Sequence, residues 1–67
     1  MREIKSYWID NVPTVEDLEE CCKVAAYDSC VVRLEWEVVG CRYMVHVDEN
    51  SVPVEVYERY VPKVYGV

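Results

Sequence analysis

The stretch from residue 31 to 47 constrains the fold more than any other part of the chain. Apolar side chains alternate with charged or polar ones on both sides of a single glycine, Gly40. A period of two is typical of a strand with one buried face. The stretch therefore predicts a β-hairpin with one apolar face, made of Val32, Leu34, Trp36, Val38, Tyr43, Val45 and Val47.

Two turns are compatible with this hairpin. A loop of Gly40 and Cys41 puts the glycine first, where a type II′ turn requires a positive φ. A loop of Val39 and Gly40 keeps the same faces and sets Glu37 against Arg42 instead. We expect the first turn, because a β-branched valine tolerates a positive φ poorly.

The residues before the hairpin predict a strand and a helix. Residues 4–9 are rich in aromatic and β-branched side chains, which favour a strand. Thr14 is a good N-cap, and Asp17 completes a capping box with it. The following residues, as far as Tyr27 to Ser29, separate into two helical faces. The apolar face comprises Val15, Leu18, Cys21, Cys22, Ala25 and Ala26.

The last segment, residues 52–61, fits both the period of a strand and the period of a helix. As a strand, its valines alternate with other residues over the first half only. As a helix, its apolar and charged residues separate over the whole segment. Ser51 can cap such a helix, Pro53 suits its first turn, and Pro62 ends it. We expect a short helix here and keep a strand as the alternative.

These elements predict a small α+β domain of order βαββα, with residues 1–67 forming one domain. A small antiparallel sheet, made of the hairpin 31–47 and the N-terminal strand, is covered on one side by the amphipathic helix. We expect a right-handed crossover to lay the helix on the apolar face. We also expect the second hairpin strand to lie in the middle of the sheet. A core this small gives modest stability.

Charge and length disfavour several classes of function. The chain carries 13 acidic and 7 basic residues, a formal net charge of −6. This charge repels phosphate backbones and anionic membranes, so direct nucleic-acid binding is not expected. No apolar run approaches the roughly 18 residues that a membrane span needs. The first ten residues lack the apolar segment of a signal peptide, so we expect a cytoplasmic protein.

The residues that usually carry chemistry show no catalytic or metal-binding pattern. The four cysteines lack the C-x₂-C and C-x₄-C spacings of zinc sites, and adjacent Cys21 and Cys22 are expected as small buried hydrophobes. Cys30 and Cys41 lie near element ends, and a thiol- or metal-dependent protein using them is our alternative function. An enzyme that uses His46 with Glu35 ranks last, because so small a core hardly encloses a pocket. No cofactor is expected.

The remaining candidate site is the surface. Tyr and Trp are enriched at protein interfaces, and carboxylates attract basic partners. The candidate acidic residues are Glu16, Glu19, Glu20, Glu35 and Glu37, and the candidate interface aromatics are Tyr7, Trp8, Tyr57 and Tyr60.

This surface predicts a small acidic intracellular protein-interaction module without enzymatic activity, whose partner is a protein with a basic surface. Arrays of carboxylates imitate phosphates towards nucleic-acid-binding proteins. Small acidic proteins of phages and mobile elements inhibit host defence nucleases in this way, and the chain is similar to them in size and charge. The specific hypothesis is therefore an inhibitor or nucleic-acid-mimicking decoy.

A symmetric homodimer is the assembly we expect, either through the edge strand, residues 4–9, or through the side of the sheet that the helices leave open. Tyr7 and Trp8 are neighbours in a strand, so one ring lies on the side of the sheet that the helices leave open. Val31, Val39 and Met44 belong to that side too. Uncovered edges and faces of this kind favour association. The net charge of −6 opposes it, so salt should strengthen the dimer.

Overall fold

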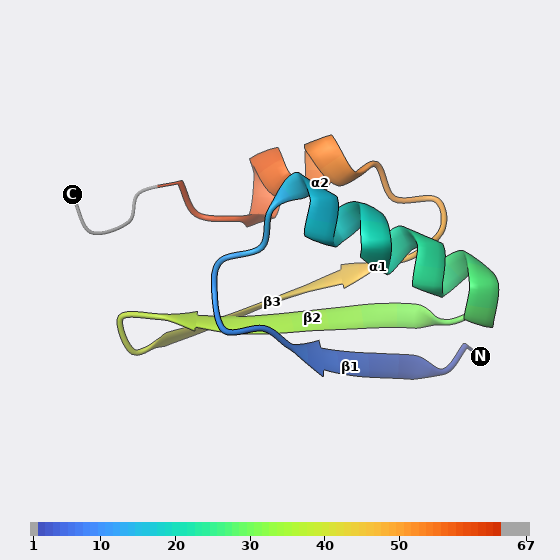
Figure 1. Cartoon of the computed structure of the whole chain (residues 1–67), viewed down its shortest axis with the longest axis horizontal. Coiled ribbons are helices and arrows are strands. Elements are labelled where there is room, and N and C mark those ends of the chain that lie inside the picture. The colour runs from blue at the N-terminus through green and yellow to red at the C-terminus, as the bar shows by residue number, and fades with distance from the viewer. Residues whose placement is uncertain (1, 64–67) are drawn as a thin grey trace.

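The structure is a computed structural model that describes residues 2–63. Its elements have the predicted order βαββα (Figure 1). They are β1 (Ile4–Trp8), α1 (Val15–Asp28), β2 (Val31–Val38), β3 (Cys41–Val47) and α2 (Pro53–Tyr60). The α+β class is therefore confirmed, and residues 53–60 are helical rather than extended.

The predicted antiparallel sheet was wrong in part, because the sheet is mixed and has the strand order β1-β2-β3. β1 runs parallel to β2, whereas β2 and β3 form the antiparallel hairpin. The prediction that the second hairpin strand lies in the middle was wrong, because β2 holds that place. α1, about 21 Å long, returns the chain to the start of β1, and β2 pairs directly with β1, which leaves no place for β3 between them. β2 then starts beside Ile4 and forms a βαβ unit with β1.

The turn of the hairpin is the second correction. Val39 and Gly40 have φ angles of 48° and 80°, so the loop consists of these two residues and Val38 pairs with Cys41. Positive φ at both positions is the signature of a type I′ turn, whose twist matches that of the flanking strands. The expected loop of Gly40 and Cys41 was therefore wrong. The free energy gained by pairing the strands in this register outweighs the cost of the positive φ at Val39.

That pairing is strongest at Trp36, which lies opposite Tyr43. The two rings are stacked, with centroids 5.7 Å apart and planes inclined by 17°. Such aromatic pairs stabilise a sheet by about 0.5–1.5 kcal/mol beyond their burial. The register of the type II′ turn would separate these two rings.

The ends of α1 follow from local chemistry. Thr14 Oγ1 accepts a hydrogen bond from the Asp17 N–H at 3.1 Å, and Asp17 Oδ2 accepts one from the Thr14 N–H at 2.9 Å. The predicted capping box is therefore present. At the other end Ser29 adopts the left-handed conformation, and its N–H donates to the carbonyl of Ala25. Of the predicted apolar face, only Ala26 is exposed.

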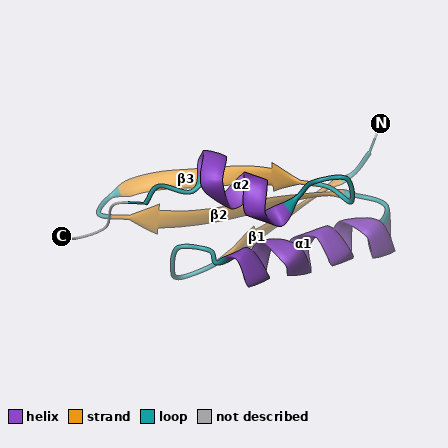
Figure 2. Cartoon of the chain, turned by 90° about the horizontal axis from the view of Figure 1, so that it is seen from above, coloured by secondary structure: helices purple, strands orange, loops and turns teal. Residues whose placement is uncertain are grey.

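Both helices lie on the same side of the sheet (Figure 1), and Figure 2 shows them beside each other. The core fills the space between these two layers. Five of the seven predicted apolar residues of the hairpin are buried, and Val38 and Tyr43 pack against them. The buried hydrophobic residues are Leu18, Cys21, Ala25, Cys30, Val32, Leu34, Trp36, Val45, Val47, Val56 and Val61.

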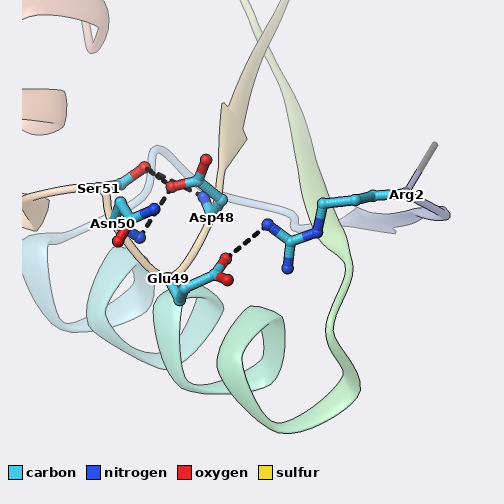
Figure 3. A network of polar contacts seen from close by, with 5 residues as sticks. All are labelled: Arg2, Asp48, Glu49, Asn50 and Ser51. Atoms are coloured by element: carbon cyan, nitrogen blue, oxygen red, sulfur yellow. Dashed lines mark hydrogen bonds and ion pairs between the residues drawn. The ribbon is translucent and has the colours of Figure 1, made fainter.

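A polar turn joins β3 to α2 (Figure 3). Asp48 Oδ1 accepts hydrogen bonds from the Asn50 N–H at 2.9 Å and from Ser51 Oγ at 3.2 Å. Ser51 Oγ in turn accepts one from the Asp48 N–H at 3.0 Å. The prediction that Ser51 caps α2 was wrong, because its hydroxyl is engaged with Asp48 and the N-cap is Val52. The Arg2 guanidinium reaches across to Glu49 at 2.7 Å.

Candidate functional site

Three of the five candidate carboxylates form one surface on α1. Glu16, Glu19 and Glu20, which we call the acidic surface of α1, are all exposed. They recur at helical spacing, so their side chains leave the same side of the helix. The ion pairs found within residues 2–63 join Arg2 to Glu49, Lys5 to Asp28, and Lys63 to Glu58. None of these pairs engages the acidic surface of α1.

The other two carboxylates lie elsewhere. Glu35 and Glu37 alternate along β2 with Leu34 and Trp36, which are buried beneath the helices. Successive side chains of a strand point to opposite faces, so Glu35 and Glu37 belong to the open face. The five candidate residues therefore lie on two surfaces of the molecule. The alternation in the sequence already predicted this separation, because Glu35 and Glu37 lie opposite the apolar hairpin face on which the helix was expected to pack.

A groove of about 260 Å³ lies between α1 and β1. Its lining is mostly apolar and includes Tyr7, Ile9 and Val24. Asp17 and Glu20 add two carboxylates to it. Glu20 thus belongs both to the acidic surface of α1 and to the groove, so the two features are continuous.

The four candidate aromatics are distributed over the molecule. Tyr7 lines the groove and is partly exposed. Trp8 lies on the open face of the sheet, where the guanidinium carbon of Arg42 stands 5.4 Å from its ring centroid. Tyr57 packs against the core, and Tyr60 is exposed on α2. They do not form one interface.

Cys30 and Cys41 lie at opposite ends of β2. Cys30 precedes the strand and is fully buried, whereas Cys41 is exposed and pairs with Val38 at the far end. Eight residues of strand separate these ends by about 26 Å. The two thiols therefore cannot share one metal ion or one reaction centre. Within residues 2–63, no group of three or more His, Cys, Asp or Glu side chains could hold a metal ion.

The cysteine pair on α1 is structural. Burial raises the pKa of the Cys21 thiol to about 11, with smaller contributions from Cys22 and the carboxylates of Asp17 and Glu20. The thiol is therefore protonated near neutral pH, and a protonated thiol is a poor nucleophile. Burial also raises the pKa of Cys22, whose Sγ donates to the carbonyl of Ser51 at 3.6 Å.

His46 has a different neighbour from the one that an enzymatic role with Glu35 would need. Its cross-strand partner is Arg33, whereas Glu35 pairs with Met44. Arg33 Nε donates a hydrogen bond to His46 Nε2 at 3.2 Å. The guanidinium thus occupies one of the two ring nitrogens of His46.

The sequence did not predict the groove. Tyr7 and Ile9 share a strand face, but the parallel pairing of β1 brings them beneath α1, and no local pattern encodes that pairing. Comparisons with protein-family models, curated proteins and solved structures found no match to this chain. No helix within residues 2–63 has the length and apolar character needed to cross a membrane.

Proposed function

We propose that this protein is a non-enzymatic interaction module that binds the basic surface of another protein. The contact is made by the acidic surface of α1 together with the adjoining groove. One observation carries the proposal: Glu20 borders the groove and stands beside two further exposed carboxylates. Protein interfaces combine an apolar anchor with a polar rim, and this part of the surface offers both.

The kind of partner follows from the charge. A net charge of −6 attracts basic surfaces from a distance and speeds their encounter. Carboxylates one helical turn apart, about 5–6 Å between their Cβ atoms, offer a row of anionic groups. A nucleic-acid-binding surface presents lysines and arginines to such a row. The protein then acts in the cytoplasm as an inhibitor or decoy that occupies a nucleic-acid-binding surface, and it does not bind nucleic acid itself.

Capture of partners from the native cytoplasm tests this proposal. The wild type should retain a basic protein at low salt and release it at high salt or when free DNA or RNA competes. The variant Glu16→Lys, Glu19→Lys, Glu20→Lys should lose this protein by at least about tenfold, because it replaces attraction with repulsion.

The control reverses the same number of charges away from the site, with Glu3→Lys, Glu55→Lys and Glu58→Lys. It should retain the partner within a few-fold. Failure to capture any protein, or equal capture by the two triple variants, would contradict the proposal.

A further inference from the structure

The side of the sheet opposite the helices carries large apolar side chains at its surface. Ile4, Trp8 and Met44 are 49%, 50% and 55% exposed. The strand register places them in two rows of the same face: Ile4 lies beside Val31, and Trp8 and Met44 flank Glu35 four residues further along the strands. No helix of the described chain covers this side (Figure 1). Apolar groups gathered on one face in this way mark an association surface.

The charged residues of this open face balance one another. Arg33 and Arg42 stand against Glu35 and Glu37, although the whole chain has a net charge of −6. The negative excess therefore lies on other surfaces, including α1. Two copies of the chain that meet through their open faces therefore experience less repulsion than two copies that meet through α1. We infer that a second copy of this chain covers the open face in a symmetric dimer.

The order of charges along β2 makes this face complementary to itself. Arg33 and Glu35 are successive residues on the open side of one strand. A twofold axis that lies above the open face, passes over β2 midway between them and runs perpendicular to the strands sets each Arg33 against Glu35 of the second copy. Isologous interfaces are built from such reciprocal pairs. The same axis places Trp8 over Ser6 of the second copy, where a small side chain leaves room for the indole ring.

The size of the face sets the strength of the dimer. Three strands spaced by about 4.8 Å, each up to about 25 Å long, offer roughly 350 Å² in projection. Contacts that bury less than about 1,200 Å² in total belong to weak complexes. The dimer therefore dissociates on dilution. It leaves the acidic surface of α1 exposed on both outer sides, so this inference stands independently of the proposed function.

Sedimentation and light scattering across a concentration and salt series test the dimer. From about 10 µM to about 1 mM, the mass should rise from 7.9 kDa towards twice that value, as a weak complex does. Salt should promote the rise by screening the net repulsion. A mass of one chain at every concentration and salt would overturn the inference.

A charge swap locates the interface. Arg33→Glu should weaken association at least about tenfold, because it sets like charges against each other twice in each dimer. Adding Glu35→Arg restores opposite charges across the axis and should recover the dimer. Arg59→Glu, on exposed α2, makes the same change in net charge and should leave the dimer within a few-fold of wild type. Circular dichroism confirms that each variant is folded. A dimer unaffected by Arg33→Glu, or a swap that recovers nothing, would overturn this face as the interface.

Discussion

The four cysteines have different access to solvent, and access governs thiol chemistry. Cys21 and Cys30 are buried in the core, Cys22 is half-buried beside Ser51, and Cys41 is exposed at the start of β3. Burial removes contact with reagents and also disfavours the charged thiolate. At Cys21 these effects combine with nearby carboxylates to raise the pKa to about 11. Cysteine is therefore a buried core residue at positions 21 and 30 and a solvent-accessible thiol at position 41.

This difference predicts a single fast thiol in the native protein. At neutral pH, Cys41 should react with the chromogenic reagent DTNB far faster than Cys21. With a pKa of about 11 rather than 9.0, Cys21 has a thiolate fraction about a hundredfold lower than an ordinary thiol. Cys41→Ser should abolish the fast phase, and unfolding in guanidinium should release all thiols of the wild type at once. A fast phase that survives in Cys41→Ser would contradict the assignment.

Among the elements, the hairpin turn is the one whose backbone conformation does not suit its residues. Val39 and Gly40 both have positive φ, a conformation that suits glycine and asparagine and strains valine. The Val39 side chain is 91% exposed and therefore contributes little packing in return. The turn persists because the strands on either side bury Trp36 and stack it on Tyr43. Register is thus decided by the whole hairpin rather than by its loop.

Replacing Val39 with asparagine should therefore stabilise the protein. Asn-Gly is a favoured pair in type I′ turns, and relief of the strain should raise the free energy of unfolding by about 1 kcal/mol. Urea titration measures this change as a higher midpoint. Gly40→Ala provides the contrast: a Cβ there meets no atom within 4 Å, so its cost is conformational, again about 1 kcal/mol. A lower midpoint for Val39→Asn would show that the turn lies elsewhere.

The whole molecule rests on one small core between a sheet and two helices. A domain of this size has a free energy of unfolding of roughly 3–10 kcal/mol. Polar contacts add little to it, because the ion pairs found within residues 2–63 join side chains that remain partly exposed. Trp36 is buried although its indole N–H has no hydrogen-bond partner in the described part of the chain. Apolar packing is therefore the main stabilising contribution.

Truncation of one core residue should then affect the entire fold. Leu18 is fully buried on α1, and Leu18→Ala should cost about 2–5 kcal/mol, a large part of the total. The melting temperature followed by circular dichroism should fall by more than about 10 °C. Val54→Ala removes an exposed side chain from α2 and should change stability by less than about 0.5 kcal/mol. Equal effects of the two substitutions would contradict the assigned core.

The sequence by itself indicated the elements of this protein, and left only residues 52–61 open between a helix and a strand. The alternation from Val32 to Val47, the capping box at Thr14 and the helical separation of residues 52–61 are short-range patterns. Each depends on a residue and neighbours a few positions away, so it can be found by inspecting the chain. The outer carboxylates of α1 were predictable for the same reason.

Only the tertiary structure decided how these elements meet. It placed β1 directly beside β2 and moved the turn to Val39 and Gly40. The groove beside Tyr7 exists because of that pairing. These features depend on contacts between residues far apart in the chain, where burial of Trp36 and the path of α1 outweigh local preference. A short-range sequence pattern does not show which of these contributions is larger, because their free energies arise from contacts in the assembled core.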